Sequence, residues 1–168
     1  MRLGINTFLF TSPFNNKSTH LFKQIKGWGF DTVELPIEDP RHIDPKHIKR
    51  ELDKSGLVCG SICACMGPDR DLRGTARQQK IGLNYLTKIL DQMVVLDCPS
   101  LIGPVYSETG RADAVPRPEY RRQWKTVAAD TTSFKSRSHD RVRRSWSRRL
   151  GGSRFAGRRK WTLVTRRT

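Results

Sequence analysis

The chain has 168 residues, 36% of them hydrophobic, which allows one domain with a buried core. It contains no apolar run long enough to span a membrane, which excludes a transmembrane protein. The formal net charge of +16 is uneven, because residues 1–130 carry +4 and the arginine-rich residues 131–168 carry +12.

Four short apolar or alternating segments predict β-strands near residues 2–8, 32–36, 57–65 and 100–105. The third is the clearest, because an uncharged run begins after Gly56 and ends before Gly67-Pro68, which is typical of a strand buried on both faces. Helical patterns follow each strand, at about 17–27, 45–55, 75–96 and from 118 onward. The second helix has the strongest start signal, with Asp44 at the N-cap and Pro45 at the first helical position.

Alternation of strands and helices without a hairpin signal predicts a parallel sheet with right-handed crossovers. A doubly wound nucleotide-binding sheet would carry a glycine-rich turn after its first strand, and residues 11–16 contain no glycine. A complete (β/α)₈ barrel needs eight such units and roughly 250 residues. This chain has four units before the pattern stops.

The four cysteines are expected to be reduced, buried thiols rather than disulfides or metal ligands. The N-terminus lacks the long apolar core of a signal peptide, which favours the cytoplasm, where thiols stay reduced. Cys59, Cys63 and Cys65 have the same parity along one strand and are therefore expected to project to one face. Such a parallel arrangement suits shared zinc ligation poorly.

Five segments in order resemble the sugar phosphate isomerase/epimerase family, which has a xylose isomerase-like TIM barrel. They are residues 2–7, 28–35, 65–72, 102–107 and 117–127. Within that family the likeness is closest to ketose 3-epimerases of the tagatose/psicose type, over about residues 1–130. The resemblance implies an α/β fold, namely the N-terminal half of a (β/α)₈ barrel with about four parallel βα units, followed by an irregular basic tail.

The resemblance also implies a ketose substrate, paired carboxylates that move a proton next to the carbonyl, and a bound Mn²⁺ or Mg²⁺. In the family the metal ligands, two Glu, one Asp and one His, come from strands five to eight. Beyond residue 130 this chain offers His139 and Asp140 but no glutamate. We therefore assign no catalytic and no metal-ligating residue, and we expect the chain to be inactive alone.

Positions that match the family's pocket predict substrate-binding residues at the carboxyl ends of the strands. They are Asn6, Phe8, Cys65, Met66 and Ser107, and Glu34 is added because it is expected at the same rim. Core packing is the alternative for Phe8 and Met66. Glu34, in a buried strand, needs either a hydrogen-bonding partner or a site to face.

Residues 131–168 form an arginine-rich tail that also contains Trp146, Phe155 and Trp161. One interpretation is nucleic-acid binding, with arginines on phosphates and aromatic rings stacked on bases. A second is a solvated segment that does not fold. The abrupt change of composition favours a third, a shifted reading frame after Asp130. A homo-oligomer in which two half-barrels pair is a further option.

Overall fold

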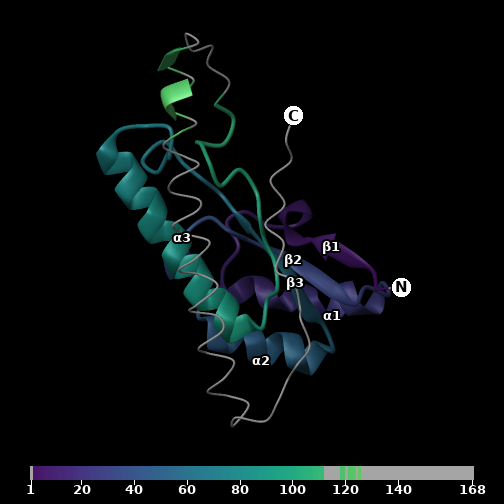
Figure 1. Ribbon diagram of the computed structural model, residues 1–168. Coiled ribbons are helices and arrows are strands. Elements are labelled where there is room, and N and C mark those ends of the chain that lie inside the picture. Colours follow the sequence, from purple (N-terminus) through teal and green to yellow (C-terminus); the bar gives the residue numbers. More distant parts are fainter. Residues whose placement is uncertain (1, 112–117, 120, 124, 126–168) are drawn as a thin grey trace, which may run out of the picture. The chain divides into compact units, whose positions relative to one another are not determined.

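A four-stranded parallel sheet organises the fold in the computed structural model, which describes residues 2–111, 118–119, 121–123 and 125. The strands lie in the order β1 (Gly4–Asn6), β2 (Thr32–Ile37), β3 (Val58–Ala64) and β4 (Leu101–Ile102), each parallel to its neighbour (Figure 1). The helical elements are η1 (Thr7–Leu9), η2 (Asn16–Thr19), α1 (His20–Gly27), η3 (Pro40–His42), α2 (Pro45–Ser55) and α3 (Ala76–Leu96). The predicted α/β architecture with sequential parallel strands is confirmed.

Strands β1 and β4 are shorter than the sequence predicts. Asn6 ends β1 because its side-chain Oδ1 accepts the N–H of Phe8 at 2.7 Å and caps the 3-10 helix η1. Phe8, expected on the strand, therefore lies in η1. After β4 the chain turns at Gly103, whose φ of +109° is a conformation that residues with a Cβ rarely adopt.

Helix α2 begins and ends as its sequence predicts. The Asp44 carboxylate accepts the N–H of Lys46 at 2.9 Å, and Pro45 occupies the first turn. Gly56 ends the helix in the left-handed conformation, with φ of +66°. The apolar stripe of Ile48 and Leu52 is fully buried.

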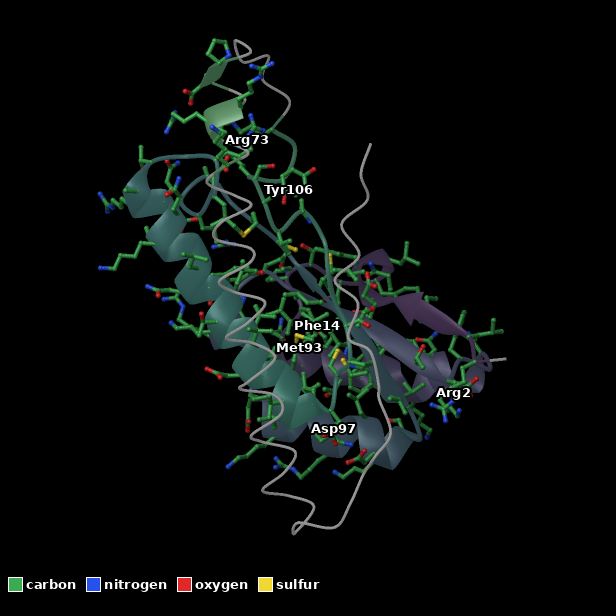
Figure 2. The ribbon with its side chains drawn as sticks, viewed as in Figure 1. Arg2, Phe14, Arg73, Met93, Asp97 and Tyr106 are labelled. Atoms are coloured by element: carbon green, nitrogen blue, oxygen red, sulfur yellow. The ribbon has the colours of Figure 1, made fainter. Side chains whose placement is uncertain are left out.

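The sheet has one buried face, which α1 and α2 line in Figure 1. On that face Val33 pairs with Cys59, and the pattern continues through two further buried pairs. These are Leu35 with Ile62 and Ile37 with Ala64. Phe14 and Met93 are buried in the same part of the molecule (Figure 2).

A β-bulge in β3 overturns the prediction that three cysteines share one face. Val33 pairs with Cys59 but Glu34 pairs with Ser61, so Gly60 is an extra residue that reverses the parity of the strand. Cys59 therefore lies on the buried face, whereas Cys63, the partner of Pro36, lies on the opposite face with Glu34 and Ser61. The spacing of the cysteines alone could not reveal the bulge.

The described residues fall into two compact units. The first comprises residues 2–65 and 88–105, and contains the sheet; the second comprises residues 66–87 and 106–111, with the described positions from 118 to 125. The helix predicted to start at 118 is helical at each of its described positions. The predicted domain boundary at residue 130 and the tail 131–168 lie outside the described residues.

Within the part of the chain that the structure describes, no helix combines the length and the apolar character needed to cross a membrane.

Candidate functional site

A partly buried carboxylate on the sheet connects three adjacent strands of the first unit. The Glu34 side chain, on β2, accepts a hydrogen bond from the Asn6 amide at 2.6 Å and another from the Ser61 hydroxyl at 2.6 Å. The backbone carbonyl of Glu34 also accepts the Thr7 hydroxyl at 2.9 Å. The face of the sheet that carries Glu34 thus holds a cluster of neutral donors around one negative charge.

The register of the strands explains why these residues meet. Asn6 is the direct partner of Glu34 in the β1–β2 pair, and Ser61 is its partner in the β2–β3 pair. Partners in a parallel pair project to the same side, so one side chain from each strand reaches the carboxylate. Two strong hydrogen bonds offset the cost of removing the charge from water.

Phe8 and Cys65, two further predicted pocket residues, flank this cluster in sequence. Phe8 follows β1 in η1, is 37% exposed, and its N–H donates to Asn6 Oδ1, which fixes the Asn6 amide toward Glu34. The core-packing alternative therefore does not describe Phe8. Cys65 is the first residue after β3 and is half-buried. The Glu34 carboxylate lies within β2 rather than at the carboxyl end of the strand, where the sequence placed it.

Two thiols of the first unit have pKa values that are shifted in opposite directions. A hydrogen bond with Cys65 lowers the pKa of Cys63, although burial and the nearby Glu34 charge act in the other direction. A hydrogen bond with Cys98, together with burial, raises the pKa of Cys59 well above its usual value. The Cys59 thiol on the buried face therefore has a raised pKa, whereas the Cys63 thiol on the face of Glu34 has a lowered pKa.

Met66 and Ser107, the remaining predicted pocket residues, belong to the second unit and are both buried. The Met66 methyl group would lie 3.0 Å from a Cβ at Gly82, so the side chain packs on α3, as the core-packing alternative expects. The Met66 carbonyl accepts the N–H of Thr109 at 3.0 Å, which joins the segments after β3 and β4.

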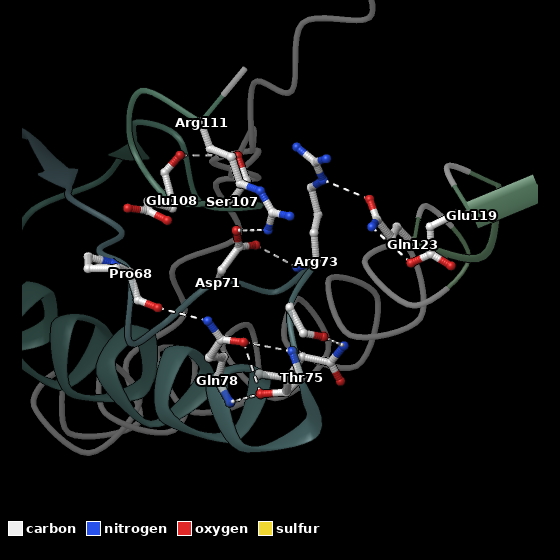
Figure 3. Close-up of polar contacts among 12 residues, drawn as sticks. Pro68, Asp71, Arg73, Thr75, Gln78, Ser107, Glu108, Arg111, Glu119 and Gln123 are labelled. Carbon is white, nitrogen blue, oxygen red and sulfur yellow. Dashed lines mark hydrogen bonds and ion pairs between the residues drawn. The ribbon is translucent and has the colours of Figure 1, made fainter. Parts of the chain in front are cut away.

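A buried ion pair holds the same two segments together. Asp71 is fully buried, and its carboxylate accepts the Arg111 guanidinium at 2.6 Å and the backbone N–H of Arg73 at 2.7 Å (Figure 3). Arg73 in turn donates to the side-chain oxygen of Gln123 at 3.0 Å. A polar cavity of about 620 Å³ opens beside this network, with Arg73 and Glu108 in its wall. From the sequence, Asp71 and Glu108 were expected to be solvated, but Asp71 is fully buried because it pairs with Arg111.

The described residues do not fit a divalent metal. Across residues 2–111 and the described positions to 125, no group of three or more His, Cys, Asp or Glu side chains is arranged to hold an ion. Glu34 already accepts two hydrogen bonds from neutral donors, whereas Mg²⁺ and Mn²⁺ need several oxygen ligands at once. We therefore place no metal on these side chains.

Two members of the cluster, Thr7 and Ser61, were missed by sequence reasoning. Side chains alternate between the two faces along β1, so Thr7, next to Asn6, was not expected to face Glu34. Its hydroxyl reaches only the backbone carbonyl of Glu34, because the chain leaves β1 at this residue. Ser61 was detectable in principle. A hydroxyl next to Gly60 in an otherwise apolar strand indicates a polar partner on the neighbouring strand.

Comparisons with known proteins show likeness to ketose epimerases over about half of their length. No family model matches the chain. A protein named "Probable ketose 3-epimerase" from Synechocystis sp. is 24% identical over 119 residues, covering 69% of this chain and 40% of that protein.

Solved structures agree on the fold. D-allulose 3-epimerase from Methylomonas sp., solved with D-allulose, has a TM-score of 0.74 at 18% identity over 83% of this chain and 48% of its own. D-psicose 3-epimerase from Clostridium cellulolyticum H10, solved with D-tagatose, has a TM-score of 0.68 at 13% identity, covering 83% and 49%. The resemblance predicted from the sequence is thus confirmed, as a xylose isomerase-like fold over the N-terminal half of such barrels.

Proposed function

We propose that the face of the sheet around Glu34 is the ketose-binding wall of an isomerase of the ketose 3-epimerase type. The observation that carries the proposal is the Glu34 carboxylate held by Asn6 and Ser61 on the face of the sheet opposite α1 and α2. In a closed barrel of this fold, that face is the interior. The likeness to proteins solved with D-allulose and D-tagatose supports a sugar as the ligand.

The chemistry of the cluster suits sugar hydroxyls. An ionised carboxylate offers about four acceptor positions, of which Asn6 and Ser61 use two. The remaining lone pairs would accept hydroxyl protons of a ketose, and charge-assisted hydrogen bonds of this kind are worth about 1.5–3 kcal/mol. In this role Glu34 binds and orients the sugar. The proton transfer next to the carbonyl is left to groups outside the cluster.

The chain spans 40% of the Synechocystis relative and 48% of the D-allulose 3-epimerase chain. That a protein containing this chain carries out the complete epimerisation is therefore also part of our proposal. Epimerisation at C3 needs a base on the carbon next to the carbonyl and a means of stabilising the enediolate. Among the described residues, no group of three or more His, Cys, Asp or Glu could hold a metal ion that would stabilise the enediolate. We propose that these residues supply sugar binding and that the acid–base and metal groups belong to the other half of the barrel.

The proposal is tested by titrating the 168-residue chain with D-tagatose or D-fructose by isothermal calorimetry. In the E34Q variant an NH2 group, which cannot accept a hydroxyl proton, replaces one carboxylate oxygen and the negative charge is lost, so the affinity should fall about tenfold or more, the equivalent of 1.4 kcal/mol. The matched control is E51Q on α2, where the half-buried Glu51 pairs with Lys54, and it should bind as the wild type does. Equal affinities of wild type and E34Q would refute the proposal.

A further inference from the structure

The polar cavity of the second unit contains one arginine whose charge the protein does not neutralise. Three arginines lie in the wall of this cavity, which has a volume of about 620 Å³. Arg111 pairs with the buried Asp71 at 2.6 Å, and Arg122 pairs with Glu119. Among the described residues, no carboxylate pairs with the third, Arg73, whose side chain donates to a neutral amide. The guanidinium of Arg73 is therefore the positive charge that the wall leaves for a ligand.

The amide of Gln123 fixes the orientation of the Arg73 guanidinium. The side-chain oxygen of Gln123 accepts the Arg73 Nε–H at 3.0 Å, and its Nε2 donates to Glu119 at 3.0 Å. Gln123 is only 5% exposed, so packing holds the amide in place as well. In Figure 3 the two terminal nitrogens of Arg73 point away from Asp71 and Gln123. A guanidinium that is held at Nε presents its terminal N–H groups in a planar fork, which matches the two oxygens of a carboxylate.

The charges of the wall favour a ligand with a single negative charge. Once the two internal ion pairs have cancelled, Arg73 and Glu108 are the charged side chains that remain in the described part of the wall. A carboxylate bound to Arg73 is neutralised by it. A second negative charge on the ligand would have no cation to pair with and would be repelled by Glu108. The wall thus suits a monocarboxylate better than a dicarboxylate or a phosphate dianion.

The same wall offers hydrogen-bond acceptors for the rest of the ligand. The Glu108 carboxylate makes no hydrogen bond within the described ranges and can only accept. The Gln79 amide donates to the Gly74 carbonyl at 3.1 Å, which leaves its oxygen as a second acceptor. Acceptors at separate positions call for several donors on one ligand, which hydroxyl groups supply. The volume lies within the range of about 300–1,000 Å³ that is usual for small-molecule sites.

We propose that this cavity binds a small polyhydroxy monocarboxylate, whose carboxylate lies on the terminal nitrogens of Arg73 and whose hydroxyl groups donate to Glu108 and Gln79. Gln123 acts as a positioning residue that holds Arg73 in the binding orientation. The site belongs to the second unit and uses none of the residues around Glu34. It is therefore independent of the ketose-binding surface proposed above, which carries a negative charge and suits an uncharged sugar.

A series of three ligands with the same carbon chain tests the charge selectivity. The 168-residue protein is titrated by isothermal calorimetry with D-glucitol, D-gluconate and D-glucarate, which carry no, one and two carboxylates. We expect gluconate to bind about tenfold or more tightly than either of the others, because it alone gains the charge-assisted bonds to Arg73 without a second charge facing Glu108. The proposal is overturned if gluconate does not bind, or if glucitol or glucarate binds as tightly as gluconate does.

Substitutions at two neighbouring arginines locate the site. R73Q should weaken gluconate binding about tenfold or more, and R73K should weaken it less, because lysine keeps the charge but lacks the planar fork. The matched control is R77Q, which removes the same charge from an exposed position of α3 outside the cavity wall and should bind as the wild type does. Urea denaturation shows that each variant is folded. Equal losses of affinity in R73Q and R77Q would overturn the proposal, because they would mean that gluconate responds to net charge alone.

Discussion

At the scale of single residues, Glu34 and Asp71 show two ways of holding a carboxylate inside this fold. Glu34 is held by neutral donors, Asn6 and Ser61, so it keeps its net charge available to a ligand. Asp71 is held by a cation, Arg111, and by the backbone N–H of Arg73, so its charge is neutralised within the protein. The first arrangement suits binding, and the second suits stability.

The Asp71–Arg111 pair should contribute strongly to stability. In D71N the amide keeps an acceptor for the Arg73 N–H, but Arg111 loses its counter-charge. We expect the free energy of unfolding, measured by urea denaturation, to fall by about 3 kcal/mol. This is the low end of the range for breaking a buried pair, because the Arg111 side chain is 25% exposed.

The control is D69N, two residues earlier, where Asp69 pairs with Arg70 at 3.5 Å and is largely exposed. Exposed pairs contribute about 0–1 kcal/mol, so D69N should unfold nearly as the wild type does. Similar losses in D71N and D69N would show that the buried pair has no special role.

Several residue-level features could be predicted from the sequence, and others could not. Asn6 and Glu34 were both expected in the pocket, and the structure joins them by a hydrogen bond. Ser61 was missed although its hydroxyl in an otherwise apolar strand was a usable signal. Cys59 was assigned to the face of Cys63 and Cys65 because the bulge at Gly60 is fixed by pairing with β2 and leaves no periodic signal in β3 itself.

At the scale of elements, local signals predicted helix boundaries better than strand boundaries. Helix α2 matched its prediction at both ends because its caps are local: Asp44 and Gly56 lie within the segment. The ends of β1 and β4 depend instead on contacts with other segments. β4 stops after Ile102 because the chain turns at Gly103 against the backbone of Ala64 in the neighbouring strand.

Gly103 should therefore be intolerant of any side chain. A Cβ at this position would collide with the carbonyl oxygen of Ala64, and the backbone conformation, with φ of +109°, disfavours alanine as well. The conformation alone costs about 1–2 kcal/mol. We expect G103A to lose more than this in urea denaturation, because the collision adds to it.

G110A isolates the contribution of the collision. Gly110 also has a positive φ, +82°, but a Cβ there would meet nothing within 4 Å. This variant should lose only about 1–2 kcal/mol, the cost of the conformation. If G103A and G110A lowered the free energy of unfolding equally, the close contact of residue 103 with the Ala64 backbone would not contribute to the loss.

At the scale of the whole molecule, the fold class and its likeness to half of an epimerase barrel could be predicted because they depend on the order of elements. Four strand–helix alternations without a hairpin signal left few topologies open, and the structure has the simplest of them, with the strands in sequential order. The role of the arginine-rich residues 131–168 stays a prediction, since composition alone is compatible with several kinds of tail.

Our central proposal is that this chain supplies the sugar-binding wall of a ketose epimerase barrel and that the groups for proton transfer and metal binding lie outside the described residues. The most direct test is to incubate the purified 168-residue protein with D-fructose or D-tagatose and Mn²⁺ and to follow C3 epimers by chromatography. A solved relative such as D-allulose 3-epimerase from Methylomonas sp. serves as the positive control. We predict no epimer above the protein-free background, because general acid–base catalysis alone is worth about 10²–10⁴-fold and requires a positioned base. Epimer formation by this chain that a chelator abolishes would contradict the claim.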